Sequence, residues 1–117
     1  MARGHRARAA ATALAGAAPV FAALGDQTRL RLVARLGAEG PLSITRLTAG
    51  TDLTRQAVTK HLRVLAGAGL ARSVPHGRER RWRLRPGPLD EVRRSLDLIS
   101  LRWDESLDRL RAAVEEE

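Results

Sequence analysis

The chain of 117 residues contains no cysteine. Disulfide bonds, thiolate metal ligands and cysteine nucleophiles are therefore excluded. No apolar run approaches the roughly 20 residues that a membrane-spanning helix needs. The first twenty residues are basic and then apolar, but their apolar part is mostly alanine, which is too weakly hydrophobic for a secretory signal. These features predict a cytoplasmic protein without a membrane segment.

Sequence motifs of catalytic sites are missing as well. The chain has no glycine-rich phosphate loop, no HExxH, no GxSxG and no carboxylate pair set apart from a helix surface. None of its serines has a base at a recognisable spacing. A short chain of small helices also offers little room for a closed catalytic pocket. We therefore expect a protein that is not an enzyme and that holds no cofactor.

Positive charge is concentrated in one part of the chain. The net charge is +8, and residues 54–87 contain nine bases and a single acid, whereas residues 88–117 contain nine acids and five bases. A basic block beside an acidic helix is typical of a nucleic-acid binder with a separate assembly element. A GC-rich genome would explain the preference for arginine over lysine, but it does not explain the clustering.

Apolar spacing predicts one mostly helical domain over residues 1–117, with a small β-hairpin (α+β). Residues 1–19 form a basic N-terminal arm and the start of a first helix, which helix propensity extends over residues 9–23. Asp26 can cap the next helix. The apolar stripe of that helix consists of Leu30, Val33 and Leu36, with Leu32 beside them.

Two short helices joined by a tight turn are predicted over residues 43–66. Ser43 and Thr54 can each cap one of them. After Gly69 the period changes from helix to strand, and residues 70–85 are predicted as a hairpin with Gly77 at its tip. A helix-turn-helix followed by a hairpin is the winged helix-turn-helix pattern. The second of the two helices, which begins after Thr54, is expected to pack on the body of the domain through residues at i, i+4 and i+7, namely Val58, Leu62 and Leu65.

Residues 88–116 form a long helix with an apolar stripe close to a heptad repeat. The stripe is longer than a small domain needs to cover its own core. We therefore expect this helix to dimerise with a second copy, together with the first helix. The residues assigned to the dimer interface are Leu96, Ile99, Trp103, Leu107 and Leu110.

The stretch TRQAVTKHL, residues 54–62, has an apolar back and a front that mixes donors and acceptors without any acid. A helix in the major groove needs this division, because bases present both donors and acceptors and phosphates repel carboxylates. Hydroxyl and ammonium groups suit phosphates, and arginines of a wing reach the backbone or a narrow minor groove. The predicted DNA-binding residues are Ser43, Thr54, Arg55, Gln56, Thr59, Lys60, His61, Arg78 and Arg80.

The segments FAALGDQTRLRLVARL, LTRQAVTKHLRVLAGAGLARS and GRERRWRL resemble the ArsR-type (ArsR/SmtB-like) winged helix-turn-helix regulators of prokaryotes. The resemblance covers about residues 20–86, and TKHLRVL followed by AGL is its most specific part. It implies a homodimer that binds double-stranded DNA at a partly palindromic operator, usually as a repressor. It also implies, for many members, release of DNA when a metal or metalloid binds.

The chain departs from this family at the metal-binding positions. The sensing cysteines are absent, and the last helix has four aspartates but no histidine. Carboxylates alone bind transition metals poorly, so we expect no metal site and leave open an inducer of unknown identity. Thr48 stands where the family usually has alanine at a tight helix contact, and Asp52 stands where the turn usually has glycine. Aspartate tolerates a left-handed conformation better than most residues, so we expect the turn to survive this change.

Two other functions fit the same features. The winged domain can serve as a protein–protein interaction module in which the basic block only keeps the chain soluble. Alternatively, the chain can be a non-specific, nucleoid-type DNA binder, which shows no preference for an operator over competitor DNA. His61 fits either a pH-sensing or ligand-binding role or that of a partly buried structural or phosphate-contacting group, and Trp103 fits either a dimer core or a ligand platform.

Overall fold

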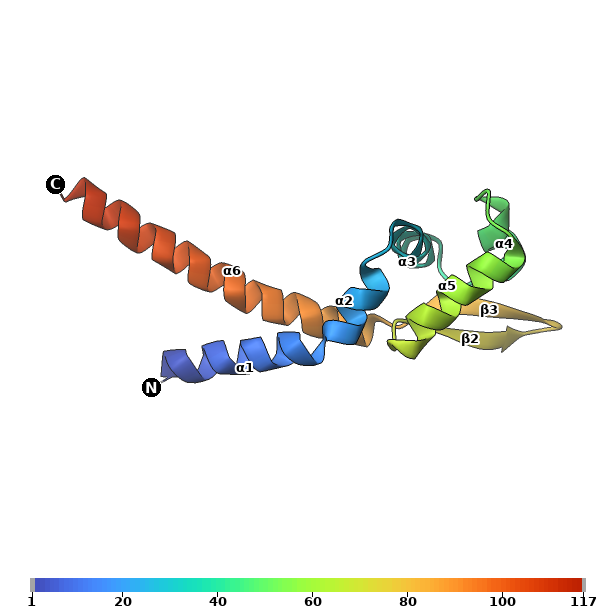
Figure 1. Ribbon diagram of the computed structural model, residues 1–117, viewed down its shortest axis with the longest axis horizontal. Coiled ribbons are helices and arrows are strands. Elements are labelled where there is room, and N and C mark those ends of the chain that lie inside the picture. The colour runs from blue at the N-terminus through green and yellow to red at the C-terminus, as the bar shows by residue number, and fades with distance from the viewer. Residues whose placement is uncertain (1, 117) are drawn as a thin grey trace. The chain divides into compact units, whose positions relative to one another are not determined.

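The computed structural model describes the backbone of residues 2–116 and their side chains except those of residues 2, 3, 6, 7 and 102 (Figure 1). The chain divides into two compact units. Residues 18–89 form one unit, and the N-terminal helix forms the other together with most of the C-terminal helix. In the described part of the chain no helix is both long enough and apolar enough to cross a bilayer.

The first predicted helix is two helices, so the expectation of a single helix over residues 9–23 is wrong. Helix α1 spans Ala2–Gly16 and α2 spans Ala18–Leu24. Ala17 lies between them, and Pro19 lies in the first turn of α2, where a proline has no hydrogen bond to lose. If one helix ran through both segments, Pro19 would lie in its interior and would remove a backbone hydrogen bond there.

Helix α3 spans Gln27–Glu39 and is capped as predicted, because the Asp26 side chain accepts from Arg29 N at 3.0 Å. Its buried residues are Leu32 and Leu36, whereas Leu30 is half exposed. The expected stripe was therefore wrong at Leu30. Leu32 and Leu36, at i and i+4, face the core, and Leu30 lies outside this narrower stripe.

The helix-turn-helix is confirmed, with α4 at Ile44–Ala49 and α5 at Arg55–Gly67. Ser43 caps α4 by accepting from Arg46 N at 3.2 Å, and Thr54 caps α5 by accepting from Ala57 N at 3.1 Å. The side chains that hold the two helices to the body are fully buried: Leu47, Val58, Leu62 and Leu65.

The turn between α4 and α5 forms with Asp52 in place, and it does so without a left-handed conformation at that residue. Among the described residues, only glycines have positive φ. The turn is held instead by Thr51, whose Oγ1 donates to Thr48 O at 3.1 Å and accepts from Leu53 N at 3.2 Å. A threonine hydroxyl thus supplies the bonds that replace a left-handed residue.

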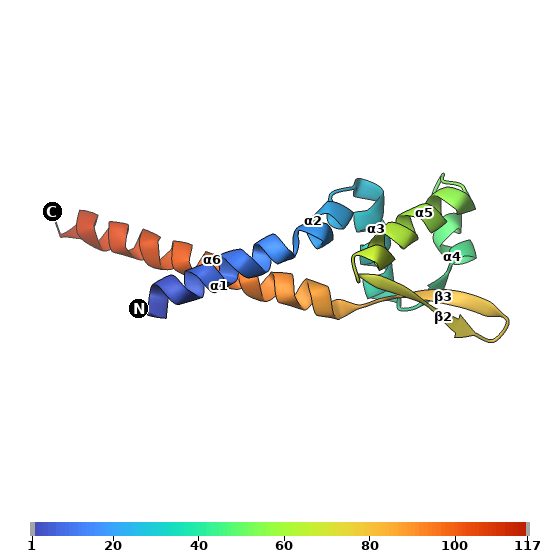
Figure 2. The same cartoon turned by 60° about the horizontal axis from the view of Figure 1, so that its bottom comes forward.

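The wing is a hairpin of β2, Ala71–His76, and β3, Glu79–Leu84, with Gly77 at its tip at φ 62° (Figure 2). A third strand that the sequence did not indicate, β1 at Leu42–Ser43, pairs with β3 opposite Trp82 and Arg81. The order is β1-β3-β2, so β2 is an edge strand.

The pairing of β2 with β3 places Pro75 at the outer edge of the sheet. Arg85 N donates to Leu70 O at 2.8 Å, and hydrogen-bonded pairs alternate along an antiparallel ladder. Pro75 lies opposite Arg80, in a pair that is not hydrogen-bonded. Its nitrogen therefore points away from β3, where a missing N–H breaks no ladder bond.

Helix α6 spans Pro86–Glu115, a length of 30 residues, and begins before the predicted start at residue 88. Pro86 and Pro88 both lie in the first turn of the helix, where their missing N–H groups have no intrahelical partner. In the unit that α6 forms with α1, the buried residues are Ala10, Val92 and Ser95.

Candidate nucleic-acid interface

The outward side of α5 carries the polar residues that the sequence singled out. Arg55, Gln56 and Lys60 are exposed, and Thr59 is half-buried beside them. Arg63 is exposed and lies one turn after Thr59, on the same side of the helix, because residues four apart lie on one face. Sequence reasoning missed Arg63, although helical spacing alone was enough to find it.

The hydroxyl groups of this region are already engaged in local hydrogen bonds. Thr54 Oγ1 accepts from Ala57 N, which leaves its own O–H free to donate to a phosphate oxygen. Thr59 Oγ1 donates to Arg55 O at 2.7 Å, so its oxygen can only accept from a ligand. Ser43 does not belong to this surface, because it is buried (9% exposed) and its oxygen caps α4.

The wing presents arginines at and near its tip. Arg78 is exposed and has neither a hydrogen bond nor an ion pair among the described residues. Arg80 is also exposed but lies across the hairpin, where its Nε donates to Ser73 Oγ at 2.8 Å and its Nη2 donates to Ser73 O at 3.3 Å. Arg81 pairs with Glu79 at 2.9 Å. Of these three arginines, Arg78 therefore has the greatest freedom to reach a ligand.

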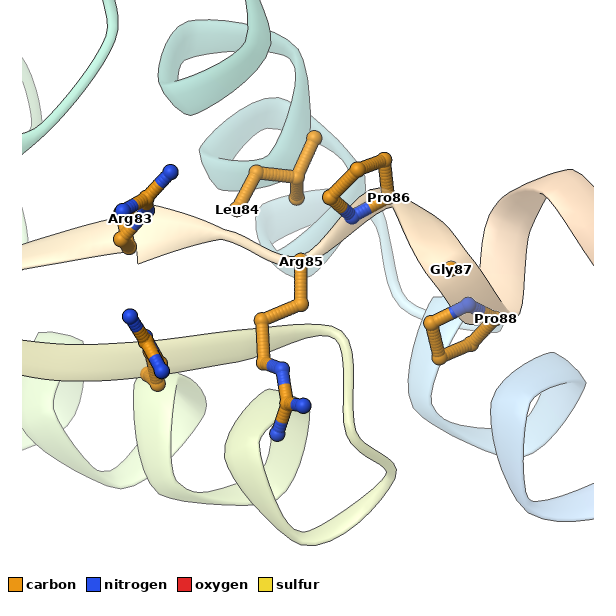
Figure 3. Close-up of a pocket in the computed structure, with 7 residues that line it drawn as sticks. Arg83, Leu84, Arg85, Pro86, Gly87 and Pro88 are labelled. Atoms are coloured by element: carbon orange, nitrogen blue, oxygen red, sulfur yellow. The ribbon is translucent and has the colours of Figure 1, made fainter.

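Three more arginines surround a hollow at the base of the wing (Figure 3). Arg72 and Arg83 are register partners on the two strands, and Arg85 lies two residues beyond Arg83 on the same side. The hollow has a volume of about 280 Å³, and no acidic residue lines it. Sequence reasoning missed this cluster, because only the strand register brings Arg72 next to the others.

His61 lies at the boundary between the buried and exposed sides of α5. It is half-buried, and its Nδ1 is 3.3 Å from Nη1 of Arg29. Asp26 is close to this pair. Its pKa is lowered from the ordinary 3.8, first because the Arg29 backbone N–H donates to the carboxylate, and further because the Arg29 guanidinium places positive charge near it.

Comparison with known proteins identifies the family. A helix-turn-helix domain family matches residues 24–74. The chain is 41% identical over 75 residues to the HTH-type transcriptional regulator Rv2034 of Mycobacterium tuberculosis, which covers 64% of this chain and 69% of that protein. It is 37% identical to an ArsR-like transcriptional regulator from Rhodococcus sp. RHA1, whose structure matches with a TM-score of 0.72 over 86% of this chain and 93% of that chain. The chain belongs to the ArsR family of transcriptional regulators.

The winged helix-turn-helix architecture of this ArsR-family regulator is shared by more distant structures. One is the homodimeric winged helix-turn-helix DNA-binding domain of Mb0332 from Mycobacterium bovis, with 24% identity and a TM-score of 0.58 over 85% of this chain and 88% of that chain. The family consists of transcriptional regulators rather than enzymes. The part of the chain that the structure describes brings no three histidine or carboxylate side chains together as a metal site.

The ArsR-family chain has a second exposed surface on α6. Large apolar residues that remain exposed in the described structure lie along one side of this helix. Trp103 is 65% exposed, and Ile99 alone among the predicted interface residues is half-buried. The others, Leu96, Leu107 and Leu110, are exposed, and Val114 continues the stripe.

Proposed function

We propose that this regulator is a homodimeric repressor that recognises a partly palindromic DNA operator with α5 and the wing. The observation that carries the proposal is the division of α5 into two sides. Val58, Leu62 and Leu65 are fully buried, whereas the opposite side exposes guanidinium, amide and ammonium groups and no carboxylate. A major-groove helix requires this combination of a firm apolar anchor and a mixed polar front.

Each exposed residue has a role that follows from its chemistry. Arg55 can donate two hydrogen bonds to guanine, and Gln56 can exchange two with adenine, so these residues specify sequence. Thr54 and Lys60 donate to phosphates and position the helix. Arg78, at the free tip of the wing, reaches the backbone or the minor groove. Arg63 adds a further cation on the same side of α5.

The homodimer is supported by the apolar stripe of α6. Contiguous exposed apolar surface of this kind is typical of an interaction site. A near-heptad spacing of apolar residues is typical of a helix that packs along a second helix like itself. A domain of the same fold, that of Mb0332, is described as homodimeric. Two recognition helices in such a dimer contact half-sites about one DNA turn apart, on the order of 34 Å.

The proposal is tested by titrating the protein into the DNA upstream of its own gene and into random-sequence DNA. We expect a salt-sensitive complex that prefers the upstream DNA. Arg55→Ala or Gln56→Ala should cost roughly 1–3 kcal/mol and relax specificity at one base position. Lys60→Ala and Arg78→Ala should weaken all sequences alike and reduce the salt dependence.

Three results would count against the proposal. Equal affinity for upstream and random DNA would identify a non-specific, nucleoid-type binder. The absence of any DNA complex would favour a protein–protein interaction module. An Arg55→Ala protein with wild-type specificity would show that another side of the domain contacts the bases.

A further inference from the structure

One guanidinium connects three helices in the unit formed by residues 18–89. Arg29 lies in the first turn of α3, and its Nε and Nη2 donate to Ala23 O at 2.6 Å and to Ala22 O at 3.4 Å. Both carbonyls are near the C-terminal end of α2. Its Nη1 lies 3.3 Å from His61 Nδ1 in α5. The Arg29 side chain therefore contacts α2 and the proposed recognition helix at the same time.

The contact with α2 has a clear electrostatic cause. The last carbonyls of a helix have no partner within the helix, and their partial negative charge attracts a cation. Arg29 supplies that cation and donates to the Ala23 carbonyl, and it also donates to the Ala22 carbonyl, which accepts from Gly25 N at 3.3 Å as well. Its backbone is fixed as well, because its N–H donates to the capping carboxylate of Asp26. The position of the Arg29 guanidinium is therefore fixed by bonds that do not involve His61.

The contact with His61 specifies a protonation state. Arginine has only donors, so His61 Nδ1 must be the acceptor. A neutral imidazole that accepts at Nδ1 carries its proton on Nε2. A doubly protonated imidazole would instead turn an N–H and a positive charge toward the guanidinium. The contact therefore requires neutral His61 with its proton on Nε2, a form that can only donate to a further partner.

We propose that Arg29 is a positioning residue for DNA binding, which holds α5 against α2 and holds His61 as the neutral Nε2–H tautomer. This inference rests on the proposed function of α5 as the recognition helix. His61 is on the same rigid helix as Arg55 and Gln56, so a shift at His61 moves both of them. Hydrogen bonds to bases weaken with small changes of distance and angle, and a shifted helix therefore binds DNA less tightly.

The first experiment compares two substitutions that remove the same charge from α3. Arg29→Gln removes the bonds to α2 and the guanidinium at His61. Arg31→Gln is the matched control, because Arg31 is exposed and has no hydrogen bond or ion pair among the described residues. At one fixed salt concentration, we expect Arg29→Gln to weaken binding to the upstream DNA about tenfold more than Arg31→Gln does. Equal losses in the two variants would overturn the positioning role.

The second experiment measures the tautomer of His61 without DNA. Long-range proton–nitrogen spectra at about pH 8, which favours the neutral imidazole, distinguish Nε2–H from Nδ1–H, and His61→Gln assigns the signal. We expect Nε2–H in the wild type and a mixture of both forms in Arg29→Gln. A wild-type protein with Nδ1–H, or with the same mixture as the variant, would refute the contact. This measurement reports on the contact itself and not on general stability.

A folding failure of Arg29→Gln and a failure of the wild type to bind DNA each have a defined consequence. If Arg29→Gln does not fold, Arg29→Lys replaces it and Arg31→Lys becomes the control. Lysine keeps the charge but lacks the planar fork that serves two carbonyls and His61 together, so a smaller loss is expected for Arg29→Lys, and none for the control. Equal affinity of the two lysine variants overturns the inference. A wild-type protein that binds no DNA refutes the proposed function and the positioning role. A loss of DNA affinity in the Arg29 variant that is absent from the Arg31 variant supports both.

Discussion

Replacing Trp103 with alanine should separate the dimer. A tryptophan side chain buries up to about 250 Å², and Trp103 is 65% exposed within the chain. Roughly 150 Å² per protomer is therefore available for burial, which at ~25 cal/mol per Å² amounts to ~4 kcal/mol. Two copies contribute ~8 kcal/mol as an upper limit. If half of this is realised, the dissociation constant rises by about three orders of magnitude.

The matched control is Leu101→Ala. Leu101 is 57% exposed, but residues two apart lie on opposite sides of a helix, so it is outside the stripe that contains Trp103. Sedimentation over a range of protein concentrations gives the dimer affinity of both variants. We expect Trp103→Ala to be largely monomeric at micromolar concentration and to bind the upstream DNA weakly, with Leu101→Ala like the wild type. If both variants keep the wild-type dimer affinity, the α6 stripe is not the interface.

Two further predictions concern stability. Thr48 Oγ1 is buried and has no hydrogen-bond partner in the described part of the chain, so Thr48→Val should raise the free energy of unfolding by about 1–2 kcal/mol in urea denaturation at fixed protein concentration. A loss of stability would mean that the hydroxyl is bonded in solution. Asp26 has a lowered pKa, so its carboxylate stabilises the fold above about pH 4 and this contribution is lost as the pH falls through the lowered value. The stability difference between wild type and Asp26→Asn should therefore vanish in acid, and a difference independent of pH would contradict this cause.

The helix-turn-helix and the hairpin could be predicted because their signals are local. A capping side chain followed by an apolar residue at helical spacing marks each helix, as Thr54 and Val58 do in α5. A glycine between two strand-like segments marks a hairpin tip, because glycine readily takes the positive φ that Gly77 has in the structure. These patterns need no knowledge of the rest of the chain.

The missed features depend on partners far away in the sequence. Strand β1 has only two residues and is defined by its pairing with Trp82 and Arg81. Arg72 joins Arg83 and Arg85 only through the strand register. The errors at Pro19 and at the start of α6 come from position within a helix, because a proline ends a helix in its interior but starts one in its first turn.

Backbone partners are the hardest to predict from a sequence. Arg29 donates to two alanine carbonyls at the end of α2, and no side-chain pattern reveals which carbonyls of a folded chain an arginine can reach. Its third partner, His61, lies 32 residues away. The polar front of α5 could be predicted as a surface, but the contact that orients it required the structure.

Pro75 at the outer edge of β2 has a consequence for how copies of the chain can associate. An edge strand with a complete row of free N–H groups can template the addition of a strand from another molecule, which leads to uncontrolled assembly. The proline nitrogen removes the donor of this edge that lies nearest the hairpin tip, and its ring occupies the space that an incoming backbone would need. The wing can therefore project into solvent without recruiting strands from its neighbours.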